Sequence, residues 1–481
     1  MSLDFGTEIA SALLSVCFKL FSSFAKAFAT ILKPRKNPEK EASRVEWTAK
    51  NPQANPQMTS LSPGGVFFGK QAAKYIVKSE NMDGHVLVIG GPGTGKSSCI
   101  AIPTLRSWKG NVFAIDVKGE LYDKTCEQRK SIKVFAPQDK TGGCGYDHYV
   151  FLKESENIAQ EARAIAQAII PLPQETKEPF WIESAQTVLT GAILHYYDLK
   201  FSFIGTLEKV LSLSPEDLIT TISKSRNIKA KLSVKTFAGM EAKTMAGITS
   251  EISRGITTLV TDDEIVRALT PQEGRPIISP LDLEAGYDVY IKIPEHLLRQ
   301  WKSLLTLMVN QFISFFERRG ESNFNRPILF LLDEFPRLGK IPSITDALAT
   351  LRSKKITICV IAQSLAQLEM VYGHDARKVI ADTCSFKAVL GATDADTQEY
   401  FSKMVGTYEK MRNTKTTNKD PYYGYDTGNS ETSTQDLEKR IIKPEEFASL
   451  QNIILLYPMP RNFCRVQKYP WYLTRARERS V

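Results

Sequence analysis

Short apolar runs recur along the chain between polar segments, and several have the length of buried strands. The runs cover residues 85–89, 111–117, 132–137, 288–294, 327–334, 356–364, 388–392 and, last along the chain, 453–457. Runs that are apolar at successive positions are typical of strands covered on both faces, as in parallel sheets. Segments with helical spacing lie between them, so the pattern predicts an α/β fold with a central, mostly parallel sheet.

Between residues 154 and 270 the strand signal fades and helical spacing takes over. Ile158, Ala162 and Ile165 recur at intervals of three and four, and residues 180–197 form a strongly apolar helical stretch. A stretch of about 115 residues is too long for a loop in a compact fold. We therefore expect an all-α domain inserted between two parts of the sheet, with its apolar residues in a core.

Residues 9–32 are long enough to cross a bilayer, but their pattern is amphipathic. Polar side chains recur at spacings of three and four and form one stripe: Ser11, Ser15, Lys19, Ser22, Lys26 and Thr30. A lysine near the centre of a lone spanning helix costs roughly 2.5 to 3.5 kcal/mol. We expect an amphipathic helix on a membrane surface. Docking on another protein and a true span are the alternatives.

The first motif with specific chemistry lies in residues 84–98, GHVLVIGGPGTGKSS. An apolar strand, a glycine-rich turn and a helix start follow one another, which is the context that a P-loop requires. Backbone N–H groups of such a turn close around phosphate oxygens, and the helix dipole favours the same anion. The residues expected to contact ATP are Gly90, Gly91, Pro92, Gly93, Thr94, Gly95, Lys96, Ser97 and Ser98.

Within this loop, Lys96 and Ser97 have the residue types that phosphate and metal binding need. Lys96 supplies a point charge to the β and γ phosphates, and the Ser97 hydroxyl is a ligand for Mg²⁺. A second metal ligand is expected from Asp333, which with Glu334 ends the apolar run 327–334. In P-loop enzymes the first acid holds Mg²⁺, and the second is placed to orient or deprotonate the attacking water.

Polar residues at the ends of neighbouring strands extend this candidate site. Gln363 ends the run 356–364 and could contact the γ-phosphate. Asp116 and Lys118 follow another strand and face the nucleotide or an adjoining subunit, or lie in a solvated turn. Arg352 is a candidate arginine finger for a neighbouring subunit's ATP, although spacing alone does not favour it over Lys354 or Lys355.

Length and composition change this picture only slightly. The chain has 481 residues, which predicts two or three domains, and 42% of them are hydrophobic, as in ordinary globular proteins. The net charge of +9 favours a polyanionic partner or an anionic membrane surface, but over this length it also fits an ordinary soluble surface. The seven cysteines form no CxxC pair and fit a reducing compartment, and the five histidines are too scattered for a zinc site.

These patterns divide the chain into six segments. They are an amphipathic helix (1–32), a proline-containing linker with little structure of its own (33–64), a nucleotide-binding domain in two parts (65–153 and 271–472), the inserted all-α domain (154–270) and a basic tail (473–481). Residues 408–440 are polar and are interpreted as a long mobile loop or an inserted hairpin. The tail could touch nucleic acid or be simply solvated.

Several of these stretches together resemble a known family. The stretches are GPGTGKSS, IPTLRSW, DVKGELYDKT, EPFWIESAQTVLTGAIL and LLDEFPRLGKIPSITDALATLRSKKITICVIAQSLAQL. They resemble the coupling proteins of type IV secretion and conjugation systems, from about residue 69 to residue 472. The resemblance implies a RecA-like motor domain with a helical insertion, assembled as a homohexameric ring on DNA.

The resemblance also implies an activity and its partners. Such proteins are ATPases that move DNA without sequence preference and hand the relaxase-bound substrate to the components of the secretion channel. Carried over by position, Lys96 and Ser97 match the P-loop pair, and Asp333 and Glu334 match the metal-holding and catalytic acids. Arg352 lies where the family places its trans-acting arginine. Gln363 likewise lies where the family places its sensing glutamine.

Two departures from the family pattern bear on these expectations. Most members begin with two transmembrane helices, whereas this chain has one amphipathic stretch, so a separate membrane adaptor is a possible partner. We expect a location in the bacterial cytoplasm, at the cytoplasmic face of the inner membrane. The stretch YDHYVFL stands where relatives read close to YNPL. A receptor or gate for protein substrates, and a soluble DNA-segregation or packaging motor, are the alternative functions.

Overall fold

The structure is a computed structural model that describes residues 46–140, 143–173, 176–321, 326–341, 343–419, 426–459 and 462–473. The chain divides into two compact units, one of Pro52–Gly406 with Ile442–Val481 and one of Met1–Asn51 with Thr407–Ile441. The expected amphipathic helix (1–32), the first part of the expected linker and residues 474–481 of the expected tail lie outside the described residues. Within the described ranges, no helix is long and apolar enough to cross a membrane.

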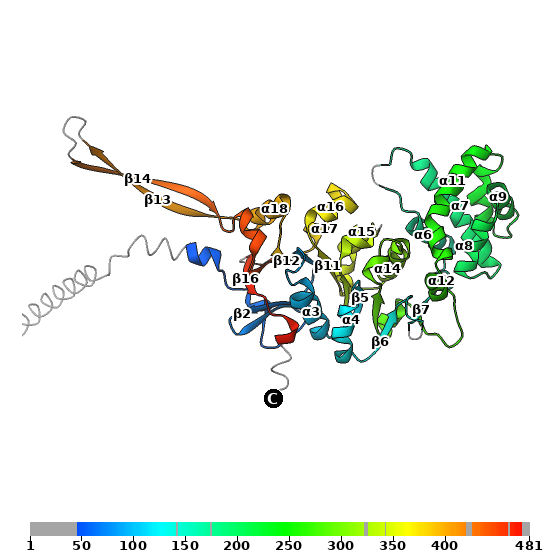
Figure 1. Cartoon of the computed structure of the whole chain (residues 1–481), viewed down its shortest axis with the longest axis horizontal. Coiled ribbons are helices and arrows are strands. Elements are labelled where there is room, and N and C mark those ends of the chain that lie inside the picture. Colours follow the sequence, from blue (N-terminus) through cyan, green and yellow to red (C-terminus); the bar gives the residue numbers. More distant parts are fainter. Residues whose placement is uncertain are drawn as a thin grey trace, which may run out of the picture. The chain divides into compact units, whose positions relative to one another are not determined.

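A twelve-stranded sheet is the centre of the larger unit (Figure 1). Its spatial order is β1-β3-β2-β16-β15-β12-β4-β11-β10-β5-β9-β6. The strands are β1 (Thr59–Ser60), β2 (Val66–Gln71), β3 (Lys74–Lys78), β4 (Val86–Gly90), β5 (Asn111–Asp116), β6 (Ile132–Phe135), β9 (Asp288–Lys292), β10 (Ile328–Leu332), β11 (Ile356–Ala362), β12 (Phe386–Gly391), β15 (Asn452–Leu456) and β16 (Phe463–Gln467). From β12 to β6 every neighbouring pair is parallel, which confirms the predicted parallel centre.

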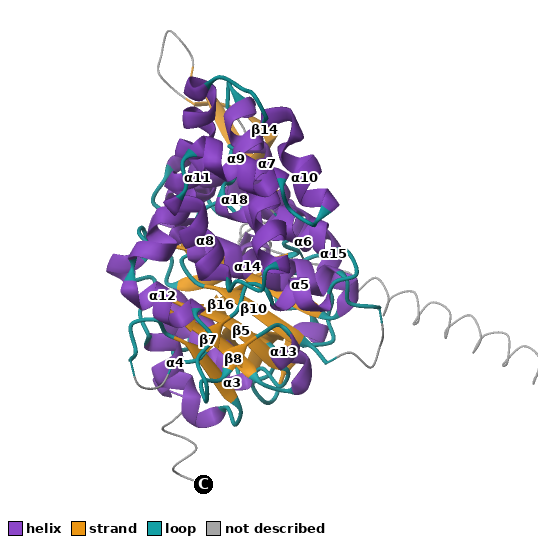
Figure 2. Ribbon diagram, turned by 90° about the vertical axis from the view of Figure 1, so that its right-hand side faces the viewer, coloured by secondary structure: helices purple, strands orange, loops and turns teal. Residues whose placement is uncertain are grey.

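Helices cover both faces of this parallel part, with α14 on one side of the strands and α3 and α4 on the other (Figure 2). They are α3 (Ile102–Ser107), α4 (Glu120–Thr125), α13 (Leu281–Ala285), α14 (Lys302–Glu317), α15 (Ile344–Thr350), α16 (Leu365–Tyr372), α17 (His374–Thr383) and α18 (Ala395–Val405). Phe113 of β5 packs on Phe312 of α14 with ring centroids 4.4 Å apart. Because both faces are covered, β4, β10 and β11 are buried along their whole length, as their apolar runs predict.

The sheet continues beyond β12 as an antiparallel extension that the sequence pattern does not predict. β15, β16, β2, β3 and β1 follow one another in antiparallel pairs. The sequence pattern places the last strand at residues 453–457, whereas β16 follows it in the structure. Gly69 of β2 lies so close to the carbonyl of Gln467 in β16 that a Cβ would collide with it. This contact joins segments far apart in sequence, which explains why local patterns miss it.

The expectation of a linker with little structure is wrong for residues 52–64. Asn55 caps a short 3₁₀ turn, Pro56–Met58, by accepting a hydrogen bond from Gln57 N (3.0 Å). β1 then pairs with β3, and the side chains of Ala54 and Met58 are buried in the core. The prolines suggested a linker, but the apolar residues between them have a sheet to pack against.

The predicted all-α domain is confirmed. It comprises α5 (Val150–Glu154), α6 (Ile158–Ile169), α7 (Pro179–Asp198), α8 (Phe203–Ser212), α9 (Pro215–Ser223), α10 (Ile228–Val234), α11 (Ala242–Thr261) and α12 (Asp263–Leu269). The central helix, α7, is buried along most of its length, as its apolar sequence predicts. A two-stranded parallel sheet, β7 (Gly145–Tyr146) and β8 (Ile277–Ile278), lies where the chain leaves and re-enters the domain built on the twelve-stranded sheet, called the sheet domain below.

The stretch YDHYVFL forms the junction between the sheet domain and the inserted domain. Gln311 of α14 accepts a hydrogen bond from Tyr146 Oη (3.0 Å), and its Oε1 lies 2.6 Å from His148 Nδ1. Tyr149 Oη lies 2.8 Å from Thr206 Oγ1 of α8, inside the inserted domain. Burial lowers the pKa of His148 to about 4, so the imidazole is neutral at physiological pH. The departure from the family pattern therefore has a packing role that sequence reasoning missed.

Within its described residues, the smaller unit contains an antiparallel hairpin. β13 (Thr407–Lys419) pairs with β14 (Asp426–Arg440), from Thr407 opposite Arg440 to Lys419 opposite Asp426. Of the two interpretations of residues 408–440, the inserted hairpin is confirmed.

Candidate active site

The glycine-rich turn connects β4 to the helical segment that begins at Lys96. Gly93 and Gly95 have φ values of 73° and 101°, in the left-handed region that favours glycine. A Cβ on Gly90 would lie 2.5 Å from Thr94 Oγ1, so only glycine fits at the end of the strand. The turn therefore has the tight conformation that surrounds a phosphate with backbone N–H groups.

Lys96 is held by the turn itself. Its Nζ donates hydrogen bonds to the carbonyls of Gly90 (2.6 Å) and Gly91 (3.2 Å). Burial lowers the pKa of Lys96, while the neighbouring carboxyl groups of Glu334 and Asp333 oppose this shift. The ammonium group is thus at the mouth of the turn and close to both acids.

The two predicted acids directly follow β10, and both are buried. Glu334 has a left-handed backbone (φ 48°), and its amide donates a hydrogen bond to Asp333 Oδ1 (3.1 Å). Burial, with the nearby charge of Glu334, raises the pKa of Asp333 to about 6. A bound cation would favour the ionised form of such an acid.

Gln363, which follows β11, connects to this acid pair. Its Nε2 donates to Glu334 Oε2 (3.2 Å), and its Oε1 accepts from Gln367 Nε2 (3.2 Å). Gln367 lies one helical turn further along, in α16, and sequence reasoning missed it. The signal that could have indicated Gln367 is that α16 begins just after the end of β11, so that the first turn of this helix lies next to Gln363.

The sheet order explains why these residues meet. β11 lies between β4 and β10, and all three strands are parallel, so the P-loop, the acid pair and Gln363 follow strands that end at the same edge. This edge is where open α/β sheets bind ligands. Lys96, Asp333, Glu334 and Gln363 are therefore brought together as predicted.

Asp116 lies at the same edge, at the end of β5, and the strands β11 and β10 separate β5 from the P-loop strand β4. Its Oδ2 accepts a hydrogen bond from Tyr122 N (2.8 Å), which holds the start of α4 after Gly119 (φ 74°). Burial raises the pKa of the Asp116 carboxyl. One of its oxygens thus has a structural role, while Lys118 is exposed.

Arg352 is not part of this cluster. It lies in the turn Leu351–Lys354, just before β11 begins, whereas the P-loop follows the end of the parallel strand β4. Its side chain is exposed, while Lys354 Nζ is bound to the carbonyl of Glu317. Arg352 is therefore at the amino edge of the sheet, away from the nucleotide edge of its own chain.

These residues fit a magnesium nucleotide better than a metal ion alone. Within the described ranges, no group of three or more His, Cys, Asp or Glu side chains could hold a metal. Mg²⁺ commonly uses one or two protein ligands and completes its shell with water and substrate phosphates. The glycine-only turn, the Ser97 hydroxyl beside Lys96 and the buried Asp333 carboxyl supply that combination.

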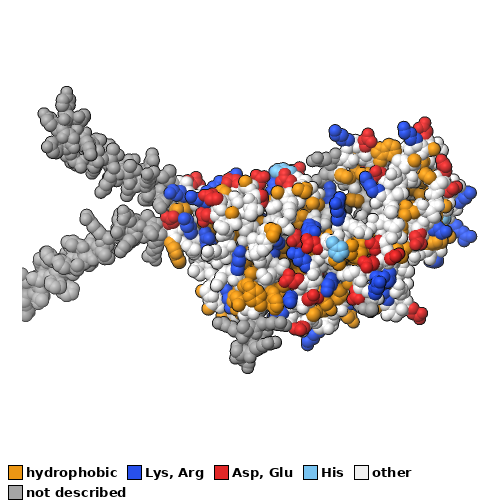
Figure 3. Space-filling model, in the orientation of Figure 1, with side chains coloured by type: hydrophobic (Ala, Val, Ile, Leu, Met, Phe, Trp, Pro, Cys, Tyr) orange, Lys and Arg blue, Asp and Glu red, His pale blue; other side chains and the backbone are white. Residues whose placement is uncertain are grey.

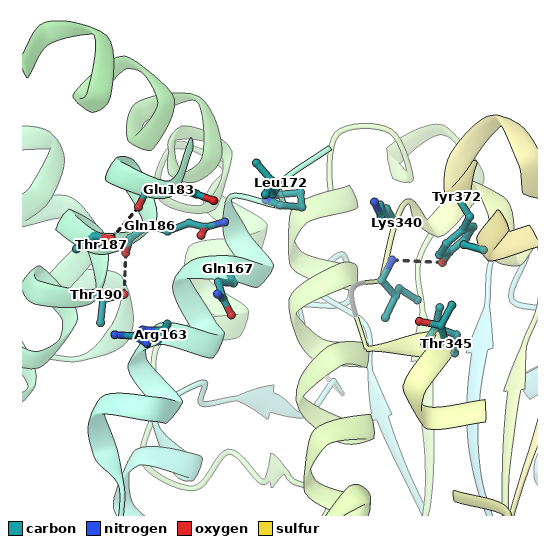
Figure 4. Close-up of a pocket in the computed structure, with 14 residues that line it drawn as sticks. Arg163, Gln167, Leu172, Glu183, Gln186, Thr187, Thr190, Lys340, Thr345 and Tyr372 are labelled. Carbon is teal, nitrogen blue, oxygen red and sulfur yellow. Dashed lines mark hydrogen bonds between the residues drawn. The ribbon is translucent and has the colours of Figure 1, made fainter. Parts of the chain in front are cut away.

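A cavity of about 710 Å³ lies elsewhere, between α6 and α7 on one side and the sheet domain on the other (Figure 4). Arg163 and Glu183 line one wall, and Lys340 lines the other. Tyr372 Oη accepts from Ile341 N (3.2 Å) and donates to the Gly339 carbonyl (3.1 Å), which fixes the loop that carries Lys340. This loop follows the acid pair by a few residues, but the cavity lining includes no P-loop residue.

The P-loop, the buried acid pair and the glutamine on the next strand, set in a parallel sheet, define a P-loop nucleotide-binding protein of the RecA-like kind. Comparison with known proteins gives the family. Residues 36–475 match the family described as type IV secretory system conjugative DNA transfer, and the chain belongs to it.

Individual relatives agree with this assignment. The chain is 27% identical over 369 residues to the protein VirD4 of Agrobacterium fabrum, covering 73% of this chain and 54% of VirD4. It is 23% identical over 418 residues to the conjugal transfer protein TraG of Escherichia coli, covering 79% and 65%. The chain thus spans about half the length of VirD4 and about two thirds of that of TraG.

Solved structures show the same fold. The bacterial conjugative coupling protein TrwB superposes with a TM-score of 0.67 and 18% identity, covering 89% of this chain and 92% of TrwB. TrwB in complex with ADP and Mg²⁺ also gives a TM-score of 0.67 at 18% identity, covering 86% and 90%.

Proposed function

We propose that the chain is an ATP-driven DNA translocase and substrate receptor that couples relaxase-bound DNA to a type IV secretion channel. The observation that carries the proposal is the contact of Gln363 with Glu334 beside Lys96, because it joins a catalytic acid to a residue on the neighbouring strand. The description of the family, which names conjugative DNA transfer, supports the DNA substrate.

Each residue of the site has a distinct chemical role in this proposal. Lys96 and the backbone amides of the turn bind the phosphates, and Ser97 and Asp333 hold Mg²⁺. Glu334 orients or deprotonates the attacking water, and Gln363 positions the Glu334 carboxylate. Bound ATP supplies the phosphoanhydride bond that is broken. The TrwB complex with ADP and Mg²⁺ supports this choice of ligands.

The proposed assembly is a homohexameric ring in which Arg352 reaches the nucleotide of a neighbouring subunit. Its exposed position at the opposite edge of the sheet supports a role between chains rather than within one. Its proposed partners are DNA, the relaxase or another secretion substrate, channel components and a membrane adaptor. The proposed location is the cytoplasmic face of the inner membrane.

The test is the rate of ATP hydrolysis with and without single- and double-stranded DNA, across a salt series, beside Lys96→Ala. We expect DNA to stimulate hydrolysis, salt to suppress the stimulation because phosphate contacts release counterions, and the variant to lose at least about 100-fold in rate. Activity retained in Lys96→Ala would reject the site. Stimulation by a protein substrate alone would favour a receptor that only gates the channel.

A further inference from the structure

One segment of the inserted domain differs in charge from the rest of the surface. On the face in Figure 3, cationic and acidic side chains are interspersed. Residues 218–240, by contrast, contain no Asp or Glu and five cations: Lys224, Arg226, Lys229, Lys231 and Lys235. All five are exposed, and within the described residues none of them forms an ion pair. The segment is bounded in sequence by Glu216 and Asp217 on one side and Glu241 on the other, and between them its charged side chains are all positive.

The same segment contains a helix with an apolar outer side. Ala230 and Val234 of α10 are buried against α7, where Gly191 allows close approach: a Cβ there would lie 3.3 Å from Val234 Cγ1. Ile228 and Leu232 point away from this contact and are 70% and 62% exposed. Large aliphatic side chains this exposed on a well-packed helix leave apolar surface without a partner.

Ile228, Lys231 and Leu232 share one face of α10, and Lys235, the residue that ends the helix, continues this face. Residues 228, 231, 232 and 235 follow the i, i+3, i+4, i+7 spacing that brings side chains together on a helix. At the start of α10, Asp198 accepts a hydrogen bond from Asn227 Nδ2 (3.0 Å), and the Asn227 side chain also caps the helix. We call Ile228, Lys231, Leu232 and Lys235 the α10 face.

We propose that the α10 face docks an acidic amphipathic segment of a protein partner. Such a segment has apolar residues that cover Ile228 and Leu232, and its carboxylates pair with the flanking lysines. This inference goes beyond the proposed function, because the α10 face contains no residue of the nucleotide site.

Two other polyanionic partners fit less well. A nucleic acid strand needs cations at the centre of the contact or aromatic rings to stack on, whereas the centre of the α10 face is a pair of aliphatic side chains. A membrane-surface helix buries an apolar face of several turns, and here the exposed apolar surface covers one turn.

The test measures binding of a fluorescein-labelled synthetic helix to the full chain by anisotropy, without nucleotide. The probe is about 18 residues of Leu, Ala and Glu, long enough to form a helix, with glutamates beside a leucine stripe. We expect Ile228→Ser/Leu232→Ser to weaken binding at least about tenfold by removing apolar contact. Lys231→Glu/Lys235→Glu should weaken it at least about tenfold and reduce its salt dependence.

A charge-matched control is available in the same domain. Lys209→Glu/Lys243→Glu changes net charge equally on α8 and α11, and should leave binding within about twofold. No binding of the probe, full binding by the serine variant, or equal loss in this control would overturn the proposal. The proposal would also be overturned if the variants lost binding to a DNA duplex or to phosphatidylserine vesicles but kept binding to the probe. ATP hydrolysis measured on the same variants separates failure here from failure of the nucleotide site.

Discussion

At the residue scale, the orientation of one side-chain amide determines how the candidate active site is connected. Gln367 donates to the Oε1 of Gln363, which leaves Nε2 of Gln363 directed at Glu334. The carboxylate therefore accepts a hydrogen bond whose donor is itself held by α16. A change in the position of α16 would act directly on the proposed catalytic acid.

His148 gives a prediction about pH. Its pKa is about 4 in the folded chain, compared with an ordinary value near 6.5, so only the unfolded state takes up a proton between these values. The stability that this contributes is complete above pH 6.5 and is lost as the pH falls toward 4. Between pH 7.5 and pH 5 the loss is about 2 kcal/mol. His148→Gln removes this titration. Between pH 7.5 and pH 5 we therefore expect its free energy of unfolding, measured with urea, to fall by about 2 kcal/mol less than that of the unmodified chain.

The control for this prediction is His374→Gln, because His374 is exposed. This variant removes a histidine without opening the core, so its free energy of unfolding at pH 7.5 should stay within about 0.5 kcal/mol of that of the unmodified chain. An identical pH dependence in His148→Gln would show that the buried imidazole does not cause the acid sensitivity.

At the element scale, the segment before β2 is part of the sheet domain. Met58 is fully buried, so Met58→Ala leaves a cavity and should lower the free energy of unfolding by about 2 to 4 kcal/mol. Leu61, three residues further on, is 86% exposed, and Leu61→Ala should change stability by less than about 0.5 kcal/mol. Urea unfolding of both variants checks this. Equal stability of the two variants would restore the linker interpretation.

The elements also show which parts of the fold the sequence could predict. The strands β4, β10 and β11 are buried on both faces, and such strands have apolar runs that are visible locally. β16 contains the polar residues Arg465 and Gln467, and its place depends on contact with Gly69 about 400 residues away. Local patterning cannot reveal such a pairing.

The residues of the candidate site also differ in whether the sequence alone could predict them. Lys96, Asp333 and Glu334 were predictable because each follows a strand in a motif whose chemistry fixes the residue type. Gln367 was not, because its role depends on the side-chain amide of Gln363 rather than on a motif. The packing of His148 against Gln311 joins two domains and leaves no local sequence signal.

At the scale of the whole molecule, Arg352 gives a prediction about assembly. Since it lies at the edge opposite its own P-loop, Arg352→Ala should keep nucleotide binding and lose at least about 100-fold of the DNA-stimulated hydrolysis. Mixing Arg352→Ala with Glu334→Gln subunits should restore part of the rate, because some interfaces then combine an intact arginine with an intact acid. Rates of the mixture and of each variant alone provide the measurement.

The matched control is Lys354→Ala, which changes a cation in the same turn that is bound to the Glu317 carbonyl. It should keep DNA-stimulated hydrolysis. Normal hydrolysis in Arg352→Ala, or no recovery on mixing, would contradict the role between subunits.

The small parallel sheet at the domain junction has a consequence for the history of this architecture. Gly145 pairs with Ile277 and Tyr146 with Ile278, so the chain departs and returns at adjacent points. A domain attached at neighbouring points can be gained, lost or exchanged without reshaping its host. Proteins that descend from one ancestral P-loop protein could therefore replace this inserted domain, and change what it binds, while the sheet that carries the P-loop stays unchanged.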